Sequence, residues 1–86
     1  MRLRQEFLAH DTGSGWVLVP TADAPFSGVV RGNATLGEIL LALSSDVAET
    51  DIVKRIRERF DAPEGVVERD VNRAIAELRR IGAIVE

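Results

Sequence analysis

Few side chains in this sequence could take part in catalysis or metal binding. The one histidine, His10, precedes Asp11 in a polar, glycine-rich stretch that we interpret as a turn over residues 10–15. The chain has no cysteine, so it lacks the sulfur that serves iron–sulfur clusters, many zinc sites and cysteine nucleophiles. A single histidine does not complete a zinc site, which takes three or four protein ligands. We therefore expect no metal site and no cofactor.

Carboxylates and serines are present, but their positions do not suggest an active site. Glu49, Asp51 and Glu58 could act as general acids or bases, yet they lie on a segment with a helical pattern, where a charged face is ordinarily solvated. Ser44 and Ser45 follow a helical segment and read as its end. The glycines match neither of the two common phosphate-binding patterns. Because no nucleophile, base and orienting group converge, we predict no catalytic residues and no enzyme.

The charged side chains of a predicted third helix are candidates for binding rather than for catalysis. Arg69, Arg73 and Arg80 fall on one side of a predicted third helix, either as a solvated face or as a contact for an acidic peptide or a nucleic acid. The chain carries a net charge of −3, and Asp70 and Glu77 flank the same arginines, so a phosphate backbone placed there would be opposed. We expect no nucleic acid partner.

The stretch from Gly28 to Leu43 organises the predicted elements. It begins as an apolar, β-branched run and changes at Asn33, a good helix N-cap, into a helical pattern. Its apolar residues recur at intervals of three and four, on one face of a helix: Leu36, Ile39, Leu40 and Leu43. The pattern predicts that a strand runs directly into a helix, with β structure before this point and α structure after it.

Three strands are expected before Asn33. A weak alternation around Leu3–Phe7 indicates the first strand, Trp16–Val19 the second, ended by Pro20, and Phe26–Arg31 the third. The connections are too short for crossovers, which favours an antiparallel meander. For Trp16 we favour a partly buried packing role over a ligand contact, because tryptophan is highly buried on average.

Two more helices are expected after Leu43. Asp46 and Glu49 have the spacing of a capping box that would open the second helix, and Gly82 stands where a glycine closes the third. The second helix has the apolar stripe Ile52, Val53, Ile56 and Phe60, with Lys54, Arg55, Arg57, Glu58 and Arg59 covering the rest of its surface. The third has the stripe Val67, Val71, Ala74, Ile75 and Leu78, followed by an extended stub over residues 83–85.

These patterns predict an α+β fold with a three-stranded antiparallel sheet followed by three helices, in a single domain over residues 1–86. The beginning of the chain has no apolar stretch of signal-peptide length, and no apolar run reaches the ~18 residues that would span a bilayer. We therefore expect a cytoplasmic protein with no membrane partner.

The order and spacing of these segments resemble the PqqD-like family, which comprises pyrroloquinoline quinone biosynthesis protein D and related recognition elements for ribosomally made, post-translationally modified peptides (RiPPs). The matching segments are Trp16–Pro20, Phe26–Asn33 with the first helical stripe, Glu49–Asp61, Asp70 and Val71 with Leu78, and Gly82–Ile84. Two positions depart from the family pattern: Gly32 stands where Leu is frequent, and Ala48 where Thr often opens the second helix.

The resemblance implies a winged-helix-like fold that binds the leader of a precursor peptide and presents it to a modifying enzyme, a radical SAM enzyme or another. The peptide would add as a strand to the edge of the third strand and lie against the third helix. The peptide-binding residues implied in this way are Ser27, Gly28, Val29, Val30, Arg31, Asp70, Arg73, Ala74 and Glu77.

Two alternatives from other functional classes stay open. A winged-helix domain could bind DNA through its third helix, although the charge distribution opposes this. An exposed strand edge could instead pair with a second copy, which would make the chain a structural subunit or a homodimer. The sequence identifies neither the peptide nor its modification, nor whether pyrroloquinoline quinone is the product.

Overall fold

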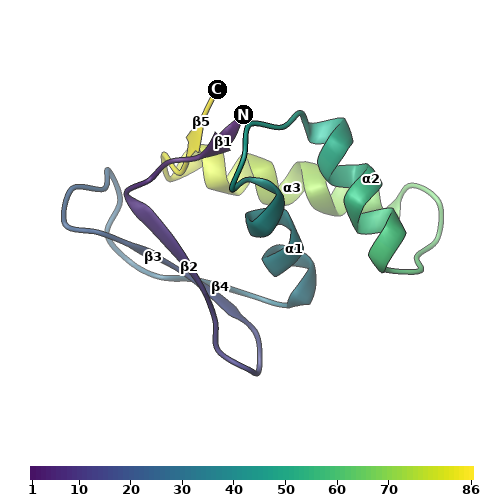
Figure 1. The fold of residues 1–86 in the computed structure, drawn as a ribbon, viewed down its shortest axis with the longest axis horizontal. Coiled ribbons are helices and arrows are strands. Elements are labelled where there is room, and N and C mark those ends of the chain that lie inside the picture. The colour runs from purple at the N-terminus through teal and green to yellow at the C-terminus, as the bar shows by residue number, and fades with distance from the viewer.

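The structure is a computed structural model that describes residues 1–86. A three-stranded antiparallel sheet lies on one side of three helices, and a two-stranded sheet joins the ends of the chain (Figure 1). The elements in chain order are β1 (Arg2–Leu3), β2 (Phe7–Asp11), β3 (Trp16–Pro20), β4 (Val30–Gly32), α1 (Ala34–Ala42), α2 (Glu49–Arg59), α3 (Val66–Arg80) and β5 (Ile84–Val85). The predicted α+β class, the three-stranded sheet and the three following helices are confirmed.

The beginning of the chain differs from the prediction. The expected first strand around Leu3–Phe7 is wrong in extent, because the chain forms β1, turns with the Phe7 N–H donating to the Arg4 carbonyl oxygen (3.0 Å), and then forms β2. His10 is therefore a strand residue paired with Val17, not a turn residue. The hairpin turn starts at Thr12, whose N–H donates to the Gly15 carbonyl oxygen, and the Gly13 N–H donates to Asp11 Oδ1 (2.8 Å).

The third strand of the meander is shorter than the predicted Phe26–Arg31. Gly28 has φ +129°, a backbone angle that side chains of L-residues rarely adopt, so the extended run cannot start before it. Val29 is 51% exposed, and only Val30–Gly32 pair with β3. The edge strand is thus three residues long and begins two residues after the kink at Gly28.

Helix ends follow local sequence in two cases and depart from it in one. The Leu36 N–H donates to Asn33 Oδ1 (3.2 Å), and Gly82, with φ +78°, comes directly after Ile81, the C-cap of α3, both as predicted. The capping box predicted at Asp46 and Glu49 is wrong. Helix α2 starts after Ala48, whose N–H donates to Asp51 Oδ2 (2.9 Å).

The three helical stripes meet the inner face of the sheet in one cluster of buried side chains. Leu18 of β3 and Ile39, Ile52, Ile75 and Leu78 of the helices are among its members. Trp16 is half-buried, as expected, and packs on α1 at Gly37, where a Cβ would come within 2.2 Å of the indole Nε1. Gly32, the unusual residue before the cap, similarly leaves room for the Leu36 side chain.

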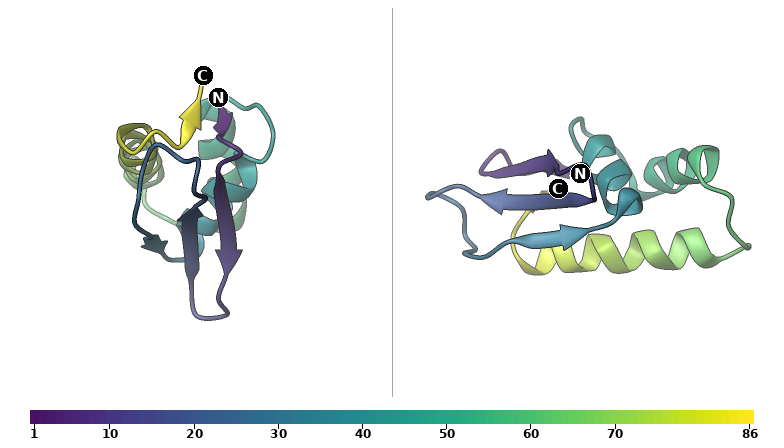
Figure 2. Two further views of the ribbon diagram at one scale, coloured as in Figure 1. Left: turned by 90° about the vertical axis from the view of Figure 1, so that its left-hand side faces the viewer. Right: turned by 90° about the horizontal axis from the view of Figure 1, so that it is seen from below.

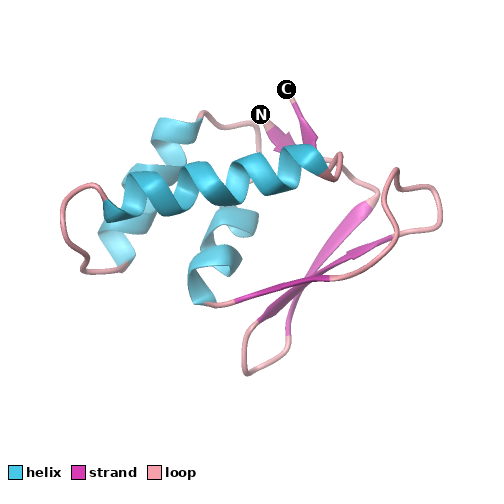
Figure 3. Ribbon diagram, turned by 180° about the vertical axis from the view of Figure 1, so that it is seen from behind, coloured by secondary structure: helices cyan, strands magenta, loops and turns pink.

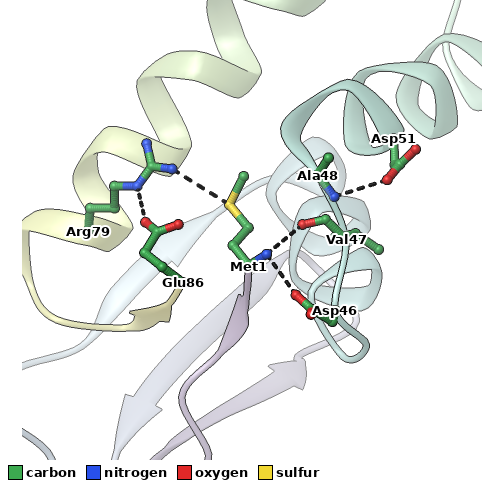
Figure 4. Close-up of polar contacts among 7 residues, drawn as sticks. All are labelled: Met1, Asp46, Val47, Ala48, Asp51, Arg79 and Glu86. Carbon is green, nitrogen blue, oxygen red and sulfur yellow. Dashed lines mark hydrogen bonds and ion pairs between the residues drawn. The ribbon is translucent and has the colours of Figure 1, made fainter.

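Strand β1 pairs with β5, and Met1, which precedes β1, bonds to the chain that follows α1 (Figure 4). The amino group of Met1 donates to Asp46 Oδ1 and to the Val47 carbonyl oxygen, each at 2.7 Å, and the charged amine holds the pKa of Asp46 below its usual range. At the other end, Arg79 Nε donates to Glu86 Oε1 (2.7 Å). No helix is long and apolar enough to cross a membrane.

Candidate functional site

A groove of about 640 Å³ lies between the edge of β4 and one side of α3. Figure 2 (right) shows β4 between β3 and α3, and Figure 3 shows from behind how β4 runs into α1, with α3 in front of the other helices. Half of the 16 lining residues are hydrophobic. The lining residues are Phe26, Val29, Val30, Arg31, Gly32, Asn33, Thr35, Leu36, Ile39, Asp70, Arg73, Ala74, Glu77, Leu78, Arg80 and Ile81.

Seven of the nine residues named from the sequence line this one groove, although they come from segments about 40 residues apart. They are Val29, Val30, Arg31, Asp70, Arg73, Ala74 and Glu77. The other two, Ser27 and Gly28, line a separate hollow of about 440 Å³ on the loop that leads from β3 to β4. The role of all nine residues in binding stays a prediction. The kink at Gly28 is the physical reason that these two residues are set apart from the edge of β4.

Sequence reasoning missed the residues that form the floor of the groove. Leu36, Ile39 and Leu78 were assigned to the core stripes alone; Ile39 and Leu78 are indeed buried, while Leu36 stays half-buried. The available signal was the position of Leu36, one turn after the cap and therefore beside the strand that feeds α1. A residue can belong to the core stripe of a helix and still line a groove at the edge of that core.

The alternation of hydrogen-bonded and non-bonded pairs in the sheet shows which backbone groups of β4 are free. The Thr12 N–H donates to the Gly15 carbonyl oxygen (2.9 Å) and the Thr21 N–H to that of Glu6 (2.8 Å). In an antiparallel ladder, bonded and non-bonded pairs alternate, so odd-numbered residues of β3 bond to β2 and even-numbered ones face β4. Leu18, an even-numbered residue, is the partner of Val30.

It follows that the backbone groups of Val30 and Gly32 bond to β3. Those of Arg31, its N–H and C=O, point away from β3, toward the open edge of the sheet. Arg31 pairs with Val17, an odd-numbered residue that bonds to β2 on its other side. No other strand pairs with β4. The open edge beside the groove therefore offers one donor and one acceptor at Arg31. The same alternation explains Pro20, whose missing N–H would point to the β4 side, beyond the last β3–β4 pair.

The groove carries both signs of charge. Arg80 Nη2 donates to Glu77 Oε2 (2.9 Å), and this bond holds the pKa of the Glu77 carboxyl below its usual range and raises the pKa of Arg80. Arg31, Asp70 and Arg73 make no ion pair within 4 Å. With Glu77 and Arg80 neutralising one another, the remaining groups give the groove a charge of about +1, in a chain of net charge −3.

The candidate chemical residues lie elsewhere. His10 is on β2, and Glu49, Asp51 and Glu58 are on α2, and none of these lines the groove. No group of three or more histidine, cysteine or acidic side chains is arranged to hold a metal ion. The groove combines apolar surface, one backbone donor and acceptor, and charged side chains. Proteins use these features to bind an extended peptide.

The chain is a small α+β domain whose free strand edge lies beside an apolar groove, a geometry to which an extended segment can add. The model of the family described as coenzyme PQQ synthesis protein D (PqqD) matches residues 8–84, and the chain belongs to this family. The solved structure described as "TbiB1 in Complex with the TbiA(beta) Leader Peptide" is similar in fold, with a TM-score of 0.77 and 17% sequence identity over 96% of this chain and 93% of that one. Comparison with curated proteins gives no match.

Proposed function

We propose that this protein is a non-catalytic module that binds the leader segment of a ribosomally made precursor peptide and presents it to a modifying enzyme. The leader adds as a strand along β4 and packs its side chains against α3. The observation that carries this proposal is the unpaired edge at Arg31 directly beside an apolar groove. Added strands gain affinity from main-chain hydrogen bonds and selectivity from side-chain pockets, and the groove supplies both.

Two further findings support the proposal. The chain belongs to the PqqD family, and TbiB1, which has a similar fold, was solved in complex with a leader peptide. A radical SAM enzyme is the partner we favour. Such an enzyme would have to bring its own iron–sulfur cluster, because this chain has no cysteine to hold one. A cytoplasmic location belongs to the same proposal.

The direct test is a titration of fluorescently labelled leader peptides, encoded beside the gene, with the purified protein. We expect saturable binding that changes little in affinity between low and moderate salt, because backbone bonds and apolar contacts dominate. The matched pair of variants is Ala74→Asp, which puts a charge on the groove wall, and Ala76→Asp, on the exposed side of α3 outside the groove. Equal binding by the two variants would contradict a site in this groove.

DNA binding and self-pairing are outcomes of the same set of measurements. A labelled duplex in place of the peptide tests the winged-helix alternative, for which affinity should fall steeply with salt. Sedimentation of the protein alone tests a homodimer formed through a strand edge. A dimer that dissociates when peptide is added would indicate that both occupants use β4.

A further inference from the structure

The two arginines Arg31 and Arg73 line the groove without a carboxylate partner within 4 Å. On α2, by contrast, Arg55, Arg57 and Arg59 all pair with carboxylates. An arginine beside an open groove without a partner is available to a ligand, and its guanidinium suits a carboxylate.

Strand geometry fixes where the Arg31 side chain lies. Cross-strand partners share a face of the sheet, and successive residues alternate between faces. Val30 is the partner of Leu18, which is 1% exposed, so the side chain of Val30 is on the core face. Arg31, the next residue, is exposed and has its side chain on the outer face of the sheet.

The same geometry extends to a strand added along β4. The free N–H and C=O of Arg31 would bond to one residue of an antiparallel peptide, and the side chain of that residue would lie on the outer face beside the guanidinium. Its two sequence neighbours would point to the inner face, toward the half-buried Leu36 and Ala74. Apolar side chains fit there, and a charged one would lose its hydration.

Building on the proposed function, we propose that Arg31 sets the register of the bound peptide by pairing with an acidic residue that has an apolar residue on each side. The groove thus selects an apolar–acidic–apolar triplet. Arg73 adds a second positive charge from the α3 side of the same groove. Specificity then depends on one charged pair, while the backbone bonds at Arg31 accept any sequence.

The test uses random 12-residue peptides displayed on phage, selected separately on the native protein, on Arg31→Glu and on Arg69→Glu. Arg69 is an exposed, unpaired arginine of α3 outside the groove, so its variant has the same net charge as Arg31→Glu. Circular dichroism melts check that all three proteins are folded. We expect the native protein and Arg69→Glu to enrich Asp or Glu between apolar residues, and Arg31→Glu to enrich Lys or Arg at that position.

A second measurement uses one enriched peptide and its Glu→Gln analogue. Cross-strand ion pairs have modest energies, so the analogue should bind about 1.5- to 5-fold more weakly to the native protein, and the difference should vanish with Arg31→Gln or in 1 M salt. Enriched peptides without the acidic triplet, or unchanged by Arg31→Glu, would overturn the proposed register and leave the peptide-binding function intact. Failure of every protein to enrich any peptide would overturn the function itself.

Discussion

Proline substitutions along β4 test the assignment of its free edge. Proline removes a backbone N–H, which is tolerated only where that N–H bonds to nothing in the fold. At Val30 the N–H points to β3, and at Arg31 it points to the groove. Val30→Pro should therefore destabilise the protein, while Arg31→Pro should leave it folded and weaken peptide binding.

The expected size of each effect follows from the partners. Val30→Pro loses one ladder bond, about 0.5–1.5 kcal/mol, and leaves the carbonyl of the buried Leu18 unpaired, about 1–3 kcal/mol. A total of about 1.5–4.5 kcal/mol corresponds to a fall in melting temperature of roughly 6–36 °C for a chain of this size. Arg31→Pro loses a single hydrogen bond to the peptide, about 1 kcal/mol or fivefold in Kd.

The assay combines thermal melts with fluorescence anisotropy of a labelled leader peptide. Val30→Ala and Arg31→Ala separate side-chain effects from the loss of the N–H, since both keep the backbone donor. Ala9→Pro is the control on the opposite edge, because the N–H of Ala9 points outward from β2 and away from the groove. A folded Arg31→Pro variant that binds the peptide as well as Arg31→Ala would refute strand addition at this edge. A Val30→Pro variant of normal stability would refute the assignment of the Val30 N–H to a hydrogen bond with β3.

Four further outcomes are expected from the packing and the charges. Leu78→Ala should cost about 2–5 kcal/mol in urea unfolding and Lys54→Ala less than about 0.5, because only the leucine is buried. Gly37→Ala should lower the melting temperature and shift the fluorescence of Trp16, whose ring occupies the space of the new methyl group. The hydrogen bond from Arg57 of α2 lowers the pKa of Glu68, so the charged carboxylate stabilises the folded protein. The native protein should therefore be more stable than Glu68→Gln. This difference should be complete above about pH 5.5 and shrink as the pH falls through the lowered pKa. Anisotropy with duplex DNA at physiological salt should show no Kd below the nonspecific range of about 10⁻⁴ M; submicromolar, salt-sensitive binding would contradict the choice of a peptide ligand.

Arg55 shows how a pattern on one helix misjudges a surface position. Its place on the charged side of α2 predicts a solvated side chain, yet its Nε donates to Glu38 of α1 (3.1 Å), which Arg59 also contacts at 3.1 Å. The periodicity of α2 contains no information about the neighbouring helix. Lys54 is therefore the better exposed control for stability measurements.

Ala48 illustrates the same limit at a helix start. The capping pattern favours Asp46, a strong N-cap residue. In the fold, the carboxylate of Asp46 bonds instead to the amino group of Met1, 45 residues earlier in the chain. The helix starts two residues later, where Asp51 bonds back to the N–H of Ala48. The bond between Asp46 and the distant Met1 thus leaves Ala48, rather than Asp46, as the residue that precedes the helix.

Sequence alone was enough for the elements whose signals are local. Apolar residues three and four apart predicted the three helices, Asn33 and Gly82 marked a start and an end, and the short connections predicted an antiparallel sheet. Side-chain periodicity and cap hydrogen bonds join residues within a few positions of one another, so they can be read along the chain.

Which side of β4 is free was settled by the tertiary fold. The apolar run before Asn33 shows a strand, but the direction of each N–H depends on the register with β3, which in turn follows the phase of the β2–β3 hairpin. A shift of one residue would exchange the roles of Val30 and Arg31. The groove itself also requires α3, because its second wall comes from residues about 40 positions further along the chain.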